Sequence, residues 1–128
     1  MSTDPASLPL GIEHTLEKEV AHEFTIQHHD PRLPAVLSTP AMIGWMEVAA
    51  AKAVQPALAP GEITVGTRIE VDHLKACGVG DVVRAWARYE GAEGRFLRFE
   101  VTAHCGEKMI GRGRVFRAIV DPARHGKR

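Results

Sequence analysis

One stretch of the chain, LSTPAMIGWMEVAAAKAV at residues 37 to 54, has the pattern of a helix, and no second stretch does. Ser38 and Thr39 are both good N-cap residues, and Pro40 suits the first helical turn, where its missing N–H has no helical partner. The helix should end near Val54, before Pro56 and the turn-rich residues that follow. A chain with a single helix has to build the rest of its core from strands.

The other periodic segments alternate polar and apolar residues, as strands do. They are residues 12 to 20, 63 to 75, 81 to 90, 95 to 105 and 108 to 120. Glycine-bearing stretches separate the last four, which predicts a meander of hairpins. In the second segment Ile63, Val65, Thr67, Ile69 and Val71 share one phase, which predicts that this set faces the core. Together these elements predict an α+β fold, with a curved antiparallel sheet wrapped around one central helix.

Length and composition limit the possible classes of protein. A chain of 128 residues suits one domain. We expect this domain over residues 12–121, a flexible tail over residues 1–11 and a basic tail over residues 122–128. Sixteen Lys and Arg residues balance sixteen Asp and Glu residues, which argues against a nucleic-acid partner. Without a long apolar segment or a signal-peptide pattern, we expect a cytoplasmic protein with no membrane partner and two reduced cysteines.

Glu47 is the acid inside the predicted helix. It lies in line with Ile43, Ala50 and Val54 at helical spacing, so its side chain should be half buried rather than solvated. Burying a carboxylate costs on the order of several kcal/mol unless it is paired or protonated. Two explanations stay open: a functional acid, or a residue at the helix edge that pairs with Lys52 or an arginine.

His73 continues the apolar phase of the second predicted strand. A core histidine satisfied by its neighbours is the commoner explanation for one such residue, but with Glu47 on the facing helix it forms a candidate acid–base pair. Gly66 inside the same strand is typical of a bulge or of close backbone approach by a ligand. It either exposes an N–H to a substrate carbonyl oxygen or makes room for the helix. Thr39 is eight positions before Glu47. That spacing leaves it a helix cap, beside backbone N–H groups that attract negative charge.

Several short motifs recur in a known family. They are S-T-P-x-M-x-x-x-M-E at residues 38 to 47, P-G-E at 60 to 62, V-G-T at 65 to 67, V-x-H at 71 to 73 and G-x-G at 111 to 113. From about residue 33 to 120 the chain resembles the fluoroacetyl-CoA thioesterase group of hot-dog fold proteins. The resemblance implies a hot-dog fold and the activity of an acyl-CoA thioester hydrolase.

The same resemblance implies roles for individual residues. It carries the catalytic set onto Thr39, Glu47 and His73, and the substrate contacts onto Gly66 and Arg117. It implies no metal and no cofactor apart from the CoA of the substrate. It also implies a homodimer whose sheets join edge to edge, with sites at the interface, where Glu47 faces His73 of the partner subunit.

One segment departs from the family pattern. The fluoroacetate-specific member has phenylalanines where this chain has Asp30 and Leu33, so we expect a different small or medium acyl-CoA as substrate. Whether Glu47 attacks the thioester or activates water stays open.

Other functions also stay open. A non-catalytic acyl-CoA or small-ligand binding module would bind without releasing thiol, and a hot-dog dehydratase would form an enoyl product. A metal hydrolase is disfavoured, because His28 and His29 lack further ligands at suitable spacing. The C-terminal quarter is basic, which indicates either a solvated strand face or a site for the phosphates of CoA. Its basic residues are Arg112, Arg114, Arg117, Arg124, Lys127 and Arg128.

Overall fold

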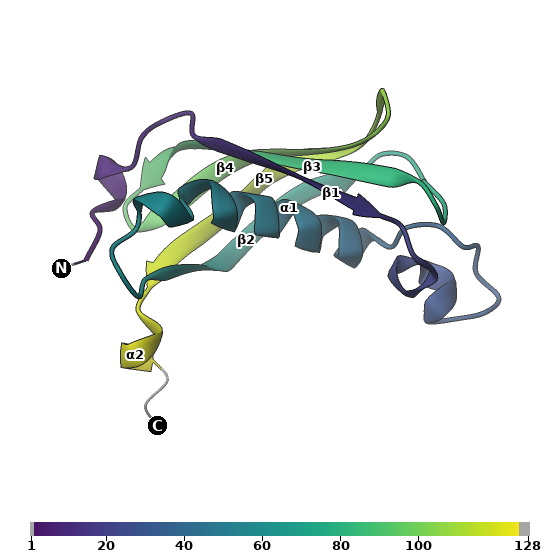
Figure 1. The fold of residues 1–128 in the computed structure, drawn as a ribbon, viewed down its shortest axis with the longest axis horizontal. Helices are drawn as coiled ribbons and strands as arrows, with labels where there is room; N and C mark the ends of the chain where they lie inside the picture. Colours follow the sequence, from purple (N-terminus) through teal and green to yellow (C-terminus); the bar gives the residue numbers. More distant parts are fainter. Residues whose placement is uncertain (1, 126–128) are drawn as a thin grey trace.

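A curved antiparallel sheet and one long helix make up the structure. The computed structural model describes residues 2–125, and in this part of the chain the sheet has five strands in the order β1-β3-β4-β5-β2. The strands are β1 (Glu13–Glu19), β2 (Ile63–His73), β3 (Val82–Glu93), β4 (Phe96–Cys105) and β5 (Lys108–Val120). Helix α1 (Thr39–Val54) lies along one face of the sheet, and the short helix α2 (Pro122–His125) follows β5 (Figure 1). The predicted α+β fold class is therefore confirmed.

The core lies between α1 and the middle of the sheet. Alternate residues of β3, β4 and β5 are fully or almost fully buried, as are the residues of one side of α1. From the strands they are Val83, Ala85, Ala87, Tyr89, Leu97, Phe99, Val101, Ala103, Ile110 and Val115. From α1 they are Met42, Trp45, Met46, Ala49, Ala50, Ala53 and Val54. The alanines let the helix axis approach the sheet closely, and Gly111 of β5 leaves room for the Met42 side chain.

The order of the strands corrects the predicted meander at one point. Strands β3, β4 and β5 form hairpins, but β2 pairs with β5 at the edge of the sheet rather than with β3. The connection between β2 and β3 is hydrogen-bonded to other parts of the chain. The Leu37 amide donates to the Cys77 carbonyl at 2.8 Å, and the Gly80 amide donates to the Val20 carbonyl at 2.9 Å. Because this connection pairs with the loop before α1 and the end of β1, it cannot close a hairpin.

The predicted buried face of β2 is wrong over most of its length. Ile63, Val65 and Ile69 are each 39 to 40% exposed, whereas Thr64, from the opposite phase, is only 6% exposed. The pairing with β5 shifts between Gly66 and Arg68, which leaves one extra residue in β2. Such a bulge reverses the alternation of side chains, so residues before and after it follow different phases.

The loop before α1 contains two short 3-10 helices, η2 (His22–Phe24) and η3 (Ile26–His28). Phe24 packs edge to face on Trp45 of α1, with ring centroids 5.2 Å apart. Ser38 donates a backbone hydrogen bond to the Phe24 carbonyl at 2.8 Å. This loop therefore covers the N-terminal end of α1. A further 3-10 helix, η4 (Gln55–Ala57), continues from the C-terminal end of α1.

The N-terminal segment lies against the domain. It includes the 3-10 helix η1 (Pro5–Ser7), and Leu8 is 4% exposed. The Thr3 hydroxyl donates to the buried Glu62 carboxylate at 2.6 Å, and the Tyr89 hydroxyl donates to the Pro5 carbonyl at 3.1 Å. The flexibility expected for residues 1–11 stays a prediction. At the other end, residues 126–128 of the predicted basic tail lie outside the described residues.

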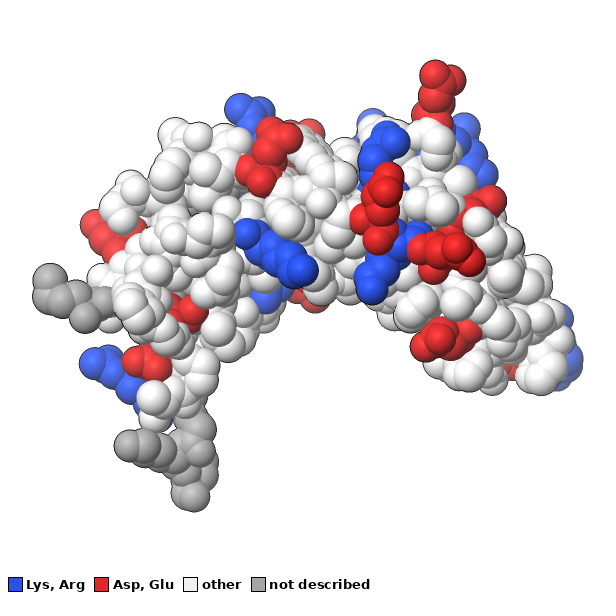
Figure 2. All heavy atoms as spheres, viewed as in Figure 1, with Lys and Arg blue, Asp and Glu red and all other residues white. Residues whose placement is uncertain are grey.

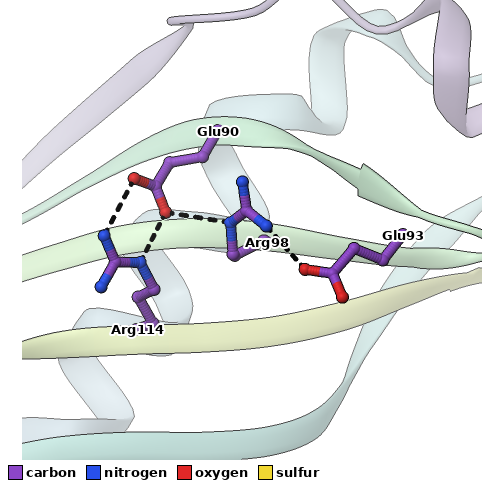
Figure 3. Close-up of polar contacts among 4 residues, drawn as sticks. All are labelled: Glu90, Glu93, Arg98 and Arg114. Carbon is purple, nitrogen blue, oxygen red and sulfur yellow. Dashed lines mark hydrogen bonds and ion pairs between the residues drawn. The ribbon is translucent and has the colours of Figure 1, made fainter.

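Paired charges occupy the face of the sheet that lies away from α1. Glu90 accepts hydrogen bonds from Arg98 at 3.3 Å and from Arg114 at 2.8 Å, while Arg98 also donates to Glu93 at 2.6 Å (Figure 3). The Arg114 hydrogen bond is the main cause that lowers the pKa of Glu90.

Acidic and basic side chains are interspersed on the face in Figure 2, with uncharged surface between them. None of the helices within residues 2–125 is long and apolar enough to cross a membrane.

Candidate active site

Only one of the two candidate cap residues at the start of α1 caps the helix. The Ser38 side chain is the N-cap and accepts a hydrogen bond from the Ala41 amide at 3.2 Å. Thr39 is therefore the first helical residue, and its hydroxyl is available for another partner. Its Oγ1 lies 2.8 Å from Nδ1 of His73, at the end of β2. The assignment of Thr39 as a helix cap is thus corrected.

His73 is half buried, with its two ring nitrogens in different situations. Nδ1 meets Thr39, whereas Nε2 is buried and has no hydrogen-bond partner among the described residues. A buried polar atom without a partner is uncommon and needs an explanation. Nε2 is therefore not engaged by any side chain or backbone group of the described residues.

Glu47 lies at the edge of the buried side of α1. Its side chain is 30% exposed, and Oε1 accepts a hydrogen bond from Nη1 of Arg117 at 3.2 Å. Of the partners considered from sequence, the structure shows an arginine and not Lys52. Burial lowers the pKa of Arg117, and the nearby carboxylate opposes that shift. Because an arginine keeps its charge in proteins, the contact is an ion pair.

Gly66 packs directly on the Glu47 carboxylate. A Cβ at this position would overlap Oε1 of Glu47 and would lie 3.3 Å from its Cδ and 3.6 Å from Nη1 of Arg117. The glycine therefore gives room to the acid side chain of the helix, which agrees with the interpretation that it makes space for α1.

The side chain of Arg117 enters the site from β5 and is only 10% exposed. Nε donates to the Thr64 hydroxyl at 2.7 Å, and Nη2 donates to the Thr64 carbonyl at 2.8 Å. Thr64 is not among the candidate residues predicted from the sequence, because its phase in β2 is the one predicted to face solvent. A polar residue on the same phase as Gly66 was the available signal.

The candidate residues fall into two groups within one chain. Thr39 meets His73 at the start of α1, and Glu47 meets Gly66 and Arg117 two turns later. Eight helical residues span about 12 Å, so one small group cannot touch both ends of that distance. An open groove of about 530 Å³ lies beside Glu47, Gly66 and Arg117, and a smaller one of about 240 Å³ lies beside His73.

The basic residues of the C-terminal quarter do not form one site. Arg117 points toward α1, Arg114 pairs with Glu90 on the other face, and Arg112 and Arg124 are exposed. Lys127 and Arg128 lie outside the described residues. Within residues 2–125, no group of three or more His, Cys, Asp or Glu side chains is arranged to hold a metal ion.

The chain's two cysteines are both free thiols. Burial is the main cause that raises the pKa of Cys77 to about 11. A thiol with so high a pKa is a poor nucleophile at neutral pH. Cys77 therefore does not compete with Glu47 as a candidate reactive group.

Comparison with known proteins identifies relatives of this chain. A sequence profile of the family described as fluoroacetyl-CoA-specific thioesterase matches residues 20–123. The fluoroacetyl-CoA thioesterase of Streptantibioticus cattleyicolor is 38% identical over 103 residues, which cover 80% of this chain and 74% of that protein.

Solved structures agree with this comparison. A mutant of the fluoroacetyl-CoA thioesterase FlK in complex with acetyl-CoA superposes with a TM-score of 0.86 at 33% identity, over 93% of this chain and 94% of that one. A hot-dog-like protein from Thermanaerovibrio acidaminovorans superposes with a TM-score of 0.84 at 24% identity, over 93% of this chain and 88% of that one. The expected hot-dog fold is therefore confirmed.

Proposed function

The chain belongs to the fluoroacetyl-CoA-specific thioesterase family, a family of thioester hydrolases, and on that premise we propose that it hydrolyses a small or medium acyl-CoA. The observation that carries this proposal is the Glu47 carboxylate, which is held by Arg117 against Gly66 and borders an open groove. A carboxylate in that position is available to a bound thioester.

In this proposal Glu47 performs the first chemical step. As a nucleophile it attacks the thioester carbonyl carbon, the C–S bond breaks, CoA leaves as the thiolate, and water then hydrolyses the mixed anhydride. As a general base it takes a proton from water while that water attacks the same carbon. Both routes consume one water and yield free CoA and a carboxylic acid, without a metal or a further cofactor.

Arg117 and Gly66 line the substrate side of this step. Three of the five N–H groups of a guanidinium are used by Thr64 and Glu47, which leaves two that are able to reach an oxygen of the substrate. Positive charge near the carbonyl oxygen stabilises the developing oxyanion. The close packing at Gly66 keeps the strand backbone next to the reacting carboxylate.

In the proposed reaction His73 transfers the proton, and Thr39 orients the imidazole ring of His73. The hydrogen bond between Thr39 and Nδ1 fixes the plane of the ring. Nε2 is then free to donate a proton to the departing sulfur or to the substrate carbonyl. For this, His73 has to be within reach of a carboxylate that the same chain keeps about 12 Å away along α1.

We propose that a homodimer resolves this separation. Strand β2 is an edge strand with three exposed apolar residues, Ile63, Val65 and Ile69. Exposed edges of this kind are usually covered. Two copies of β2 that pair antiparallel about a two-fold axis between residues 69 and 70 bring Gly66 opposite His73 of the partner subunit. Each site then takes Glu47 from one chain and His73 from the other.

The loop that covers the start of α1 supports a substrate other than fluoroacetyl-CoA. Asp30 forms an exposed ion pair with Arg32 at 2.9 Å, and Leu33 is 40% exposed. Neither supplies an aromatic ring to close over a very small acyl group. We propose a cytoplasmic enzyme that accepts acyl groups larger than fluoroacetyl.

The test is release of free thiol from a panel of acyl-CoAs of two to twelve carbons, about the small-to-medium range. The proteins compared are the wild type, Glu47→Ala, His73→Ala and the control Glu17→Ala, whose residue is exposed on β1. We expect the wild type and the control to release CoA at equal rates, and each site variant to be slower by about a hundredfold or more.

The same assay separates the alternatives. Tight binding of acyl-CoA without thiol release would favour a binding module, and an enoyl product without free CoA would favour a dehydratase. Equal background rates in all four proteins would refute the hydrolase.

A further inference from the structure

We infer that Thr64 is a positioning residue of this site, which holds the Arg117 guanidinium in the orientation that keeps the Glu47 carboxylate in place. The inference rests on the proposed function, because this role matters for the reaction only if Glu47 acts on the thioester.

The first support is the burial of Thr64. It is 6% exposed, while the rest of β2, which lies wholly in the described part of the chain, is partly or fully exposed. Before the bulge, Thr64 and Gly66 lie on the phase of β2 that faces α1. Thr64 is hydrogen-bonded to Arg117, and Gly66 lies beside the Glu47 carboxylate and Nη1 of Arg117.

The second support is the pair of hydrogen bonds by which Thr64 holds the Arg117 guanidinium. Its hydroxyl accepts from Nε and its carbonyl accepts from Nη2, at 2.7 and 2.8 Å. These two nitrogens lie on one edge of a rigid, planar group. Fixing that edge fixes the remaining nitrogen, Nη1, which is the one that donates to Glu47.

The third support is that the carboxylate depends on Arg117 for its position. Oε1 of Glu47 has Gly66 on one side and Nη1 of Arg117 on the other. A glycine excludes little volume, so within residues 2–125 the hydrogen bond from Arg117 is the contact that holds the carboxylate back from the open groove beside it. Loss of the Thr64 hydroxyl would leave Nε of the buried Arg117 without its hydrogen-bond acceptor. The guanidinium would then rotate toward another acceptor.

The test compares Thr64→Val, which removes the hydroxyl at nearly constant volume, with Thr64→Ser, which retains it. We expect Thr64→Val to lower kcat by about 10- to 100-fold, the effect of one lost hydrogen bond to a charged group, with KM changed less than about threefold. Thr64→Ser should stay within about threefold of the wild type. Thr102→Val is the matched control, since Thr102 lies in a groove on the opposite face of the sheet.

A double-mutant cycle separates positioning from a general structural role. If Thr64 acts through the arginine, Thr64→Val should lower kcat no further in an Arg117→Lys background, whereas independent effects would multiply. Multiplying effects, or a Thr64→Val enzyme with wild-type kcat, would overturn the inference while leaving the hydrolase intact. A wild type that releases no thiol would overturn both.

A measurement on the wild type keeps the test independent of how the variants fold. Nitrogen-15 NMR reports the solvent exchange of the Arg117 Nε–H. We expect slow exchange, because this proton is buried and bonded to Thr64. Exchange as fast as that of exposed arginines would refute the hydrogen bond between Arg117 and Thr64 on which the inference depends.

Discussion

Gly66→Ala tests the geometry around Glu47 with one added methyl group. The backbone at Gly66 lies outside the left-handed region, so alanine is tolerated there without backbone strain. Its Cβ would overlap Oε1 of Glu47 and lie 3.3 Å from Cδ. The carboxylate is the end of a flexible, partly exposed side chain, so it should yield by turning away from Arg117 into the groove.

The expected effects on stability and on activity have separate causes. Turning Glu47 out breaks an ion pair whose arginine side chain is only 10% exposed, a loss of about 1 to 3 kcal/mol. Replacing glycine restricts the unfolded chain, which offsets about 0.4 to 1 kcal/mol of that loss. The free energy of unfolding should therefore fall by less than about 3 kcal/mol, which leaves a domain of ordinary stability folded in the assay. Displacing the reacting carboxylate should lower kcat by about a hundredfold, a barrier increase of about 2.7 kcal/mol.

The two effects are measured by urea unfolding and by the thiol-release assay on the same protein. Gly78→Ala is the matched control, because a Cβ there would meet nothing closer than the Ala35 carbonyl at 3.7 Å. It should keep the wild-type kcat. A Gly66→Ala enzyme with kcat within about threefold of the wild type would refute the role given to the Glu47 position.

Three further predictions concern other parts of the chain. Val65→Lys places a charge on the exposed edge of β2, so it should convert the proposed dimer to a monomer in light scattering. Val79→Lys, on an exposed loop, should not. A Val65→Lys variant that stays dimeric would exclude this edge as the interface. The Thr3 hydrogen bond lowers the pKa of Glu62 below 4.5, so its stabilisation is present above that pH and is lost as the pH falls through the lowered value. The difference in melting temperature between wild type and Glu62→Gln should therefore be present at pH 7 and shrink as the pH falls below 4.5, and a constant difference would contradict it. With a pKa of about 11, Cys77 should resist iodoacetamide at pH 8 while the partly exposed Cys105 reacts, as read by mass spectrometry; equal alkylation in the folded protein would contradict its burial.

The sequence predicted the elements of the fold well because their signals are local. The helix begins at Thr39 and ends at Val54, close to the predicted bounds, since a cap, a proline and a terminating turn define it. Each predicted strand appears within a few residues of its expected bounds. Alternation and glycine-bearing turns are properties of neighbouring residues, and they do not depend on which strands pair.

The predictions failed where contacts between residues that are far apart in the sequence determine the structure. Gly66 indicated a bulge as one explanation, but no local signal shows that the phase of β2 reverses there and turns Thr64 inward. The arginine that pairs with Glu47 is 70 positions away, so the sequence could propose an arginine without choosing Arg117 as the partner. Ser38 and Thr39 are equivalent as caps by sequence, and the position of His73 distinguishes them.

The most direct measurement mixes two inactive chains. If each site takes Glu47 from one chain and His73 from its partner, a heterodimer of Glu47→Ala and His73→Ala contains one intact site. Random pairing of equal amounts makes half the dimers heterodimers, so thiol release should recover to about a quarter of the wild-type rate. A mixture that forms heterodimers, as shown by native mass spectrometry, yet stays as inactive as either parent would contradict the shared site.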